Sequence, residues 1–461
     1  MDAGWTRCAP ATSRRLKHSG QWSVISDQVP AVSVRQCAVL VGGLGTRLGT
    51  LTANTPKPLL RCGDRPFLAW LLREFVRFGV EEFVLLSGHL SGEVVAAAEA
   101  LTALLPRGVR IAISEEPVRA GTGGAVFHAR ERLDQRFLLC NGDSLFDCNL
   151  ANLLAAAAED APGIGRMLLR QVDDAFRYGV VTLDGDRVSE FLPRASVSGE
   201  AGGRAAKRID APPPRPSPAS REREGGLINA GIYLFDRSLI EALSPDCSLE
   251  TDVLPRLAAR GALRGTVAGG YFRDIGVPED FALADGEIPG LLHRPALFLD
   301  RDGVMNVDHG WVGTRERFEW TAGAREAVRL ATQAGWHVFV VTNQSGVARG
   351  HYDEAAVRQL HGWMVDEVRR AGGTIDDIRY CPYHEDAVVA AYRRASDWRK
   401  PAPGMLLDLI RTWELDPARC ILVGDQPSDL AAAAEAGIRA RRFQGGNLAD
   451  FVRPIIEGRT A

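Results

Sequence analysis

Two groups of phosphate-binding motifs follow one another along this 461-residue chain, and their order limits the folds it can adopt. The first group opens with the glycine-rich segment 42–48 (GGLGTRL) and continues with Pro-Lys-Pro at 56–58. The second opens with FLDRDG at 298–303 and continues with TNQSG at 342–346, Arg-Lys-Pro at 399–401 and Gly-Asp at 424–425. Both groups begin directly after a short apolar run. We therefore expect two consecutive domains, each with a phosphate site of its own.

Short apolar, β-branched runs alternate with amphipathic segments in both halves. In the first half the pattern predicts strands at 37–41, 83–86, 109–113 and 137–140, and helices over 66–78, over 92–104 and after residue 123. In the second half it predicts strands at 296–299, 338–341 and 420–423, and helices from residues 324, 354 and 404 and near 429–436. Such alternation indicates the α/β class, with two doubly wound, mainly parallel sheets.

Composition places the domain boundaries. Residues 1–36 are interpreted as a disordered extension, 37–287 as the first domain and 295–461 as the second, with a short connection near 286–295. Within the first domain, 194–226 contains a proline-rich stretch and an Arg-Glu repeat with almost no large apolar residue. A segment that cannot bury apolar surface does not order itself, so we expect a flexible insertion there.

The overall charge and the cysteines exclude several classes of protein. A net charge of −3 gives no basic field for nucleic acid or an anionic membrane surface. No apolar run reaches the roughly 18 residues of a membrane helix, and the N-terminus does not resemble a signal peptide. The eight scattered cysteines suit free thiols in a reducing compartment. We therefore expect a cytoplasmic protein without nucleic-acid or membrane partners; its oligomeric state stays open.

Five side chains of the second half suit phosphoryl transfer through an aspartate. Asp300, at the end of a predicted strand, can attack phosphorus, and Asp302 can protonate the leaving alcohol and then activate water. Asp425 follows another strand and can complete a Mg²⁺ site, Thr342 can hydrogen-bond phosphoryl oxygens, and Lys400 can neutralise charge in the transition state. The pattern predicts a phosphatase.

The first half suits handling of a nucleoside triphosphate. Gly42, Gly43 and Gly45 let backbone N–H groups approach phosphate closely, and Arg47 can grip the triphosphate. Lys57, on a stiff segment between two prolines, can neutralise the phosphate under attack. Asp143 and Asp274 are the expected Mg²⁺ pair. Only four of the chain's 55 basic residues are lysines, and two of them are Lys57 and Lys400, which suggests that both sites need a compact ammonium charge.

Residues 296–450 resemble the haloacid dehalogenase phosphatase superfamily, in particular the D-glycero-D-manno-heptose 1,7-bisphosphate 7-phosphatases and the related histidinol-phosphate phosphatases. The resemblance implies a fold without a large cap domain. It also implies that Asp302 contributes its carbonyl oxygen to the Mg²⁺ site with Asp300 and Asp425, that Arg399 contacts substrate and that Asn343 contacts phosphate.

One departure from this resemblance concerns zinc. Many relatives carry a zinc loop of the type Cys-x-His followed by Cys-x-Cys, and the matching positions here are Cys381, Tyr383, Ser396 and Trp398. Cys381 and the neighbouring His384 cannot make a four-ligand site. We expect no zinc, and a loop held by packing of Tyr380, Tyr383 and Trp398.

Residues 38–286 resemble the sugar-1-phosphate nucleotidyltransferases, whose fold is Rossmann-like, and most of all the heptose- and mannose-1-phosphate guanylyltransferases. The matching segments are 42–48, 56–58, 121–124, 141–143, 177–179, 229–231 and 274–280. The resemblance places Gly121 near the base, and Asn229 and Glu250 near the sugar. Arg194 stands where the family has a lysine that grips the sugar phosphate, and it can substitute for that lysine.

Together the resemblances imply a bifunctional enzyme that uses Mg²⁺ in both domains. It would remove the 7-phosphate of a heptose 1,7-bisphosphate and couple the heptose 1-phosphate to a nucleotide, most simply GMP from GTP, for lipopolysaccharide, capsule or glycoprotein assembly. Two alternatives stay open. One is a histidinol-phosphate-type phosphatase fused to a mannose-1-phosphate guanylyltransferase. The other is a phosphatase whose N-terminal domain binds a nucleotide or sugar without catalysis.

Overall fold

The computed structural model describes residues 34–173, 175, 179–193 and 225–458. The predicted extension, apart from its last three residues, and the predicted insertion, apart from its last two, lie outside these ranges. Arg194, Arg177 and Tyr178 also lie outside the described residues. The domain boundaries expected from the sequence therefore stay predictions.

Nine strands of the described first half form one mixed sheet in the order β5-β4-β1-β6-β11-β8-β12-β10-β9. The bounds in chain order are β1 Gln36–Leu40, β4 Glu82–Ser87, β5 Arg110–Glu115, β6 Arg136–Asn141, β8 Gly165–Val172, β9 Val180–Asp184, β10 Arg187–Leu192, β11 Gly226–Asp236 and β12 Leu263–Val267. Strands β5, β4, β1 and β6 are parallel to one another, which is the arrangement predicted from the sequence. Their carboxyl ends therefore meet along one edge.

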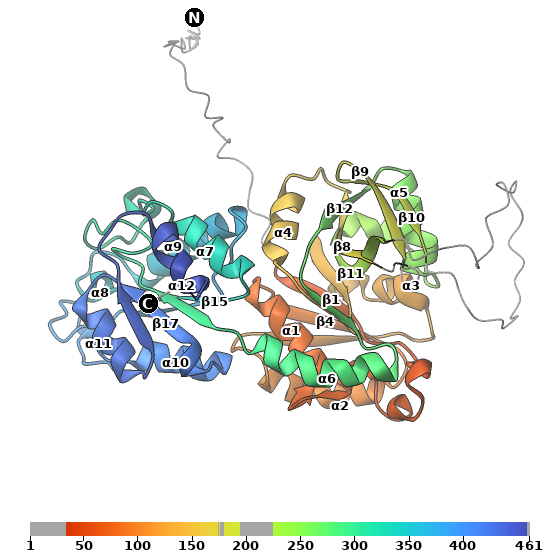
Figure 1. The fold of residues 1–461 in the computed structure, drawn as a ribbon, viewed down its shortest axis with the longest axis horizontal. Coiled ribbons are helices and arrows are strands. Elements are labelled where there is room, and N and C mark those ends of the chain that lie inside the picture. The colour runs from red at the N-terminus through yellow and green to blue at the C-terminus, as the bar shows by residue number, and fades with distance from the viewer. Residues whose placement is uncertain (1–33, 174, 176–178, 194–224, 459–461) are drawn as a thin grey trace, which may run out of the picture. The chain divides into compact units, whose positions relative to one another are not determined.

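Helices cover both faces of this sheet. The helices are α1 Phe67–Arg77, α2 Ser91–Ala103, α3 Gly121–His128, α4 Leu150–Ala158 and α5 Leu254–Ala259. Alternate residues of β1 face opposite cores: Cys37 and Val39 pack with α1, α2 and α4, whereas Ala38 packs with α3 and α5. Figure 1 shows α4 and α5 on opposite sides of the strands β8 and β12. The first domain is thus doubly wound, as expected.

The sequence did not predict the antiparallel part of the sheet. Strand β11 runs antiparallel to β6 and β8, and β10 runs antiparallel to β9 and β12. A separate antiparallel pair joins β7 Ser144–Asp147 to β13 Tyr271–Asp274, with Asp274 opposite Ser144. Because Ser144 directly follows Asp143 in the chain, this pairing brings Asp274 close to Asp143.

In the second half, five parallel strands form a sheet in the order β16-β15-β14-β17-β18. The strands and helices in chain order are β14 Ala296–Leu299, α7 Ala324–Gln333, β15 His337–Asn343, α8 Ser345–Ala348, α9 Glu354–Arg370, β16 Asp377–Cys381, α10 Gly404–Trp413, β17 Cys420–Gly424, α11 Pro427–Glu435, β18 Arg439–Arg442 and α12 Leu448–Ile456. Helices α7, α9 and α12 share one core with Leu297 and Leu299, and α10 and α11 share the other with Phe298. This domain is also doubly wound.

The connection between the halves differs from the prediction. Helix α6 spans Pro278–Leu292, so most of the segment expected to be a connection is helical. Ala284, Ile288 and Leu292 recur every fourth residue and are buried in one apolar cluster, and this stripe stabilises the helix despite Gly286, Pro289 and Gly290. Only residues 293–295 separate α6 from β14.

Buried polar contacts join residues of the two halves. Arg77 of α1 donates to Asp376 at 2.8 Å and to the Trp336 carbonyl at 2.9 Å. Arg294, in the segment that connects the halves, donates to Glu74 and to Asp147 of the first half, each at 2.7 Å. All five side chains are well shielded from solvent, with Asp376 fully buried.

The seven cysteines that the structure describes are buried free thiols. No helix among the described residues has the length and apolar character needed to cross a membrane.

Candidate active sites

The phosphatase site is built around a buried charge pair. Asp300 follows β14 directly, and its carboxylate lies 2.8 Å from the ammonium of Lys400. Lys400 also lies 2.7 Å from Asp429 and donates to the Val341 carbonyl at 3.0 Å. Burial opposes the charge on Lys400, but Asp300 and Asp429 outweigh it and raise its pKa. Burial raises the pKa of Asp300 to about 7, against the opposing effect of Lys400.

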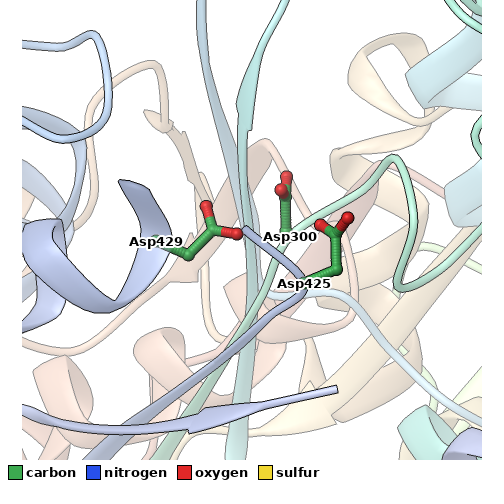
Figure 2. Close-up of side chains that lie close together, drawn as sticks. All are labelled: Asp300, Asp425 and Asp429. Atoms are coloured by element: carbon green, nitrogen blue, oxygen red, sulfur yellow. The ribbon is translucent and has the colours of Figure 1, made fainter. Parts of the chain in front are cut away.

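Three carboxylates form a group that fits a divalent cation. Oxygen atoms of Asp300, Asp425 and Asp429 lie within 4.8 Å of one another, and Figure 2 shows the three side chains around one small space. The Oδ1 atom of Asp425 is buried without a hydrogen-bond partner. A hard cation such as Mg²⁺ would compensate for this by binding the oxygen. Gly303, with a φ of 82°, makes room for this carboxylate, because a Cβ atom there would lie 2.5 Å from Asp425.

The sequence analysis missed Asp429. It stands at the start of α11, where its side chain accepts the N–H of Gln426 at 2.9 Å. The four-residue spacing from Asp425 was the available signal, since the start of a helix directly after a strand brings both carboxylates to one place.

Asp302 is held by three side chains. Its oxygens accept hydrogen bonds from the guanidinium of Arg301 at 2.9 to 3.2 Å, from Asn306 at 3.0 Å and from Gln344 at 2.9 Å. Arg301 is completely buried and also donates to the carbonyl of Val312. The acid–base residue predicted from the sequence thus lies beside Asp300, in a fixed orientation.

Thr342, Asn343 and Arg399 are placed differently from one another. Thr342, the last residue but one of β15, lines the same cavity as Asp300 and accepts a hydrogen bond from Gln344 at 2.8 Å. The side-chain amide of Asn343 donates to the carbonyl of Lys400 and accepts the N–H of Lys400, both at 3.0 Å, so it orients the lysine. A direct contact of Asn343 with phosphate stays a prediction. Arg399 points to the Tyr383 carbonyl at 3.5 Å and does not line the cavity.

A cavity of about 240 Å³ lies at this site, and its lining includes Asp300, Asp302 and Thr342. Its lining combines the buried Asp300 and Lys400, here called its floor, with the more exposed Gly310, Trp311 and Tyr352, here called its wall. At about 30 Å³ per water molecule, the cavity is larger than a phosphoryl group alone requires. It therefore has room for part of the group that carries the phosphate.

The loop at the family's zinc positions is held by aromatic and polar contacts. The guanidinium of Arg394 lies 3.7 Å from the centre of the Tyr383 ring, and Tyr383 also contacts Tyr392. Trp398 packs against the apolar core, and its backbone N–H donates to Ser396. Cys381 is the one thiol at the four positions, a donor set that does not fit zinc.

In the first domain, Lys57 joins the two predicted metal ligands. Its ammonium lies 2.6 Å from Asp143 and 3.4 Å from Asp274. Asp143 follows β6 and Asp274 ends β13, so the β7–β13 pairing brings them together. Burial and the proximity of Asp143 raise the pKa of Asp274, while Lys57 and Arg47 oppose this rise. Two adjacent carboxylates around one cationic charge fit a divalent cation.

The glycine-rich loop lies at the same end of the sheet. Gly42 follows β1 closely, and a Cβ atom there would lie 2.8 Å from the backbone nitrogen of Gly88. Arg47 is the second residue of the short helix Thr46–Thr52. Its guanidinium lies close to Gly276 and Asp274. The structure thus brings together the loop, Arg47, Lys57 and both carboxylates.

The residues predicted near the base and sugar lie on neighbouring elements. Gly121 begins α3 with a φ of 73° and packs against the backbone of Cys247. Asn229 on β11 donates to the hydroxyl of Tyr233 at 2.6 Å, and Glu250 lies close enough to Tyr233 to raise the pKa of that phenol, although burial is the larger cause. Whether these side chains contact a sugar stays a prediction.

The sequence analysis also missed Glu116. It follows β5, and its carboxylate accepts the N–H of Ala120 at 3.0 Å while lying against Gly42 and Gly88. Burial raises its pKa. A half-buried carboxylate between the phosphate loop and α3 is suited to accept hydrogen bonds from a ligand.

Both the folds and the sites define phosphate-transferring enzymes. A family model described as Nucleotidyl transferase matches residues 37–288, more than half of the chain, and a HAD-hydrolase-like model matches residues 397–447. The chain belongs to the nucleotidyl transferase family in its first half and, as the relatives below show, to a haloacid dehalogenase phosphatase family in its second. Both resemblances inferred from the sequence are confirmed.

The relatives of the second half are phosphatases. The chain is 50% identical over 163 residues to D-glycero-beta-D-manno-heptose-1,7-bisphosphate 7-phosphatase of Rhodopseudomonas palustris, covering 35% of this chain and 91% of the relative. The enzyme of the same name from Escherichia coli K12 is 42% identical over 144 residues, which cover 31% of this chain and 75% of the relative.

Among solved structures, HddC from Yersinia pseudotuberculosis is 24% identical, with a TM-score of 0.44. The match covers 55% of this chain and 99% of the HddC chain.

Proposed function

We propose that this chain makes a nucleotide-activated heptose in two steps. The second domain removes the 7-phosphate of D-glycero-D-manno-heptose 1,7-bisphosphate, and the first domain transfers GMP from GTP to the resulting heptose 1-phosphate. The observation that carries the first step is the 50% identity to a phosphatase named for this substrate, together with the Asp300–Lys400 pair at the site.

In the phosphatase step, the carboxylate of Asp300 attacks phosphorus while the bond to the sugar oxygen breaks. Asp302 gives a proton to the leaving oxygen, then takes one from the water that hydrolyses the aspartyl-phosphate, and inorganic phosphate leaves. To reach the leaving oxygen, Asp302 must rotate away from Arg301 and Gln344, which hold it in this structure. Mg²⁺, held by Asp300, Asp425 and the carbonyl of Asp302, with Asp429 available as a further ligand, would supply positive charge to the phosphoryl oxygens.

In the transfer step, a phosphate oxygen of heptose 1-phosphate attacks the α-phosphorus of GTP, and pyrophosphate leaves. Lys57 and Arg47 would stabilise the charge on the phosphate oxygens, and Asp143 with Asp274 would hold Mg²⁺. Arg194 is proposed to bind the sugar phosphate, with Asn229 and Glu250 near the sugar and Gly121 near the base.

Glu116 supports guanine as the base. The Watson–Crick edge of guanine presents an N1–H and an N2–H donor side by side, and a carboxylate can accept both. Uracil and thymine present one N–H between two carbonyl oxygens, which a carboxylate repels. The carboxylate of Glu116 lies against Gly42 and accepts the N–H of Ala120 next to the start of α3, so a nucleotide whose phosphates bind the loop would bring its base toward this carboxylate.

The phosphatase assignment is tested by measuring phosphate release from a panel of substrates. The panel contains each anomer of the heptose 1,7-bisphosphate, histidinol phosphate and mannose 6-phosphate. We expect the largest kcat/KM with one heptose anomer and no activity in Asp300→Asn. A preference for histidinol phosphate would instead favour the first alternative function.

The transferase assignment is tested by pyrophosphate release from GTP and heptose 1-phosphate. We expect Asp143→Ala to abolish it without changing phosphate release from the bisphosphate. If the wild-type chain releases no pyrophosphate with any nucleoside triphosphate, the N-terminal domain is a binding module, which is the second alternative.

We also propose that the 381–398 loop functions without zinc. Its donor set offers one thiol, and Arg394, Tyr383 and Trp398 supply the contacts that hold it.

A further inference from the structure

The loop between Asp302 and the short helix Arg315–Arg317 displays an exposed tryptophan. Among the seven tryptophans that the structure describes, Trp311 alone has more than a third of its surface exposed, at 49%. Its backbone φ is 47°, a left-handed conformation that bulky residues rarely adopt. An exposed indole on a disfavoured backbone contributes little to folding, so its position needs another explanation.

Hydrogen bonds fix the loop on both sides of Trp311. Arg317 donates to the carbonyls of His309 and Gly310 at 3.0 and 2.9 Å, and Asp308 accepts the N–H of Gly310 at 2.8 Å. After the tryptophan, the carbonyl of Val312 accepts from buried Arg301, the residue that also holds Asp302. The loop is therefore rigid and tied to the catalytic residues.

A second segment supports the indole ring. His351 stacks on Trp311 with ring centres 4.1 Å apart and planes 24° from parallel. The next residue, Tyr352, packs against Gly313 so closely that a Cβ atom there would lie 2.1 Å from its ring, and its hydroxyl donates to Gln344 at 2.9 Å. One face of Trp311 is thus covered by His351, and its side chain lines the cavity above Asp300 and Lys400.

We propose that Trp311, supported by His351, is the surface on which the sugar ring of the phosphatase substrate stacks. The inference rests on the proposed function and deepens it. A pyranose presents a flat face of C–H groups beside its hydroxyls, and an aromatic ring gains contact area from such a face at a small cost in side-chain entropy. With the phosphate at the cavity floor, the ring attached to it meets the wall that carries Trp311.

This arrangement makes Trp311 a residue of substrate specificity. The catalytic groups at the floor recognise any phosphate monoester, because they contact only the phosphoryl group. An aromatic wall beside them distinguishes esters of a ring-shaped sugar from esters of short, flexible alcohols. The disfavoured backbone at position 311 holds the indole in place before substrate arrives.

The test compares wild type with Trp311→Ala, Trp311→Phe and Trp311→Gly on two substrates, heptose 1,7-bisphosphate and glycerol 3-phosphate, which has no ring. For Trp311→Ala we expect KM for the bisphosphate to rise about tenfold, and kcat/KM for glycerol 3-phosphate to stay within about twofold. Trp311→Phe should restore most of the affinity. Trp311→Gly should raise KM as alanine does, yet raise Tm, because glycine accepts a positive φ without strain.

The outcomes separate the inference from the proposed function. An unchanged KM for the bisphosphate in Trp311→Ala, with an active wild type, would overturn the inference alone. Equal losses on both substrates with a lowered Tm in Trp311→Gly would show a structural role and also overturn it. A wild type inactive on the bisphosphate would overturn the proposed function and this inference with it. Val388→Ala, an exposed residue of the same domain outside the cavity, is the matched control and should change neither substrate.

Discussion

At the level of single side chains, Lys400 lies between two buried carboxylates, and its replacement should separate the two activities. In Lys400→Met, Asp300 and Asp429 lose their shared cation. We expect kcat for phosphate release to fall by about 10²–10³, the usual effect of removing one group that stabilises transition-state charge. Lys400→Arg should not restore phosphate release, because the larger planar guanidinium does not fit the space of a buried ammonium.

The control for this prediction is contained in the same chain. Pyrophosphate release by the first domain should be unchanged in Lys400→Met. If phosphate release from the bisphosphate stayed within about threefold of wild type, the charge pair would not belong to the catalytic site.

Glu116 gives a second prediction at this scale. Glu116→Gln replaces one of the two acceptors with a donor, so we expect kcat/KM for GTP to fall by about 10- to 100-fold and the preference for GTP over UTP to shrink. The measurement is initial pyrophosphate release with each nucleotide. Equal losses for all nucleotides would contradict a role in reading the base and indicate a general effect on the loop at Gly42.

Several residues found from the sequence share one property, which the missed residues Asp429 and Trp311 lack. Asp300, Thr342, Asp425 and Asp143 come directly after apolar runs, so parallel topology alone predicts that they meet at one edge. Asp429, Glu116 and Trp311 lie in loops or helix starts without a motif of their own. The spacing from Asp425 was a signal for Asp429, but the roles of Glu116 and Trp311 depend on which residues lie opposite them in space, and a single sequence does not contain that information.

At the level of elements, the parallel strands and their helices were predictable, whereas the antiparallel pairing of the remaining strands was not. Strands β1, β4 and β6 are largely apolar runs because both faces are buried. In β10, exposed and buried residues are mixed, a pattern that a surface loop shares. Helix α6 was interpreted as a connection because Gly286, Pro289 and Gly290 weaken the helical signal, and tertiary burial of one stripe outweighs them.

The 381–398 loop supplies the prediction at this scale. After treatment with a zinc chelator and restoration of Mg²⁺, we expect Tm and phosphate release to be unchanged, since Arg394 and Tyr383 hold the loop. Elemental analysis should find no stoichiometric zinc. Loss of activity that added zinc restores would contradict the proposal. The variant with Tyr383→His, Ser396→Cys and Trp398→Cys rebuilds four donors and serves as the positive control.

At the level of the whole molecule, buried ion pairs link the two halves. Arg77→Met leaves the fully buried Asp376 without its guanidinium partner, although His337 still contacts it at 2.6 Å. We expect the free energy of unfolding to fall by about 3–5 kcal/mol, measured by denaturant titration. The control is Arg110→Met, whose exposed pair with Glu82 should contribute at most about 1 kcal/mol. Equal effects of the two variants would contradict the importance of the buried contact.

The same cluster predicts how stability depends on pH. Burial lowers the pKa of His337. Burial alone would raise the pKa of Asp376, but Arg77 and His337 outweigh it, so the pKa of Asp376 is also lowered. A group whose pKa is lowered by folding takes up protons more readily when unfolded, so stability falls as pH falls. For His337 the loss begins below about pH 6.5, its unfolded value. The slope between pH 7.5 and 5 should be smaller in His337→Asn; an identical slope would show that other groups cause it.

The most direct test of the two-step account is phosphorus NMR of the intact chain with Mg²⁺, GTP and one anomer at a time of D-glycero-D-manno-heptose 1,7-bisphosphate. We predict inorganic phosphate first, then pyrophosphate together with the paired signals of a new diphosphate diester, with one anomer only. Asp300→Asn should stop both steps, and Asp143→Ala only the second. A diphosphate diester that forms in Asp300→Asn at the wild-type rate, or phosphate release without any diester from either anomer, would contradict the proposed sequence of reactions.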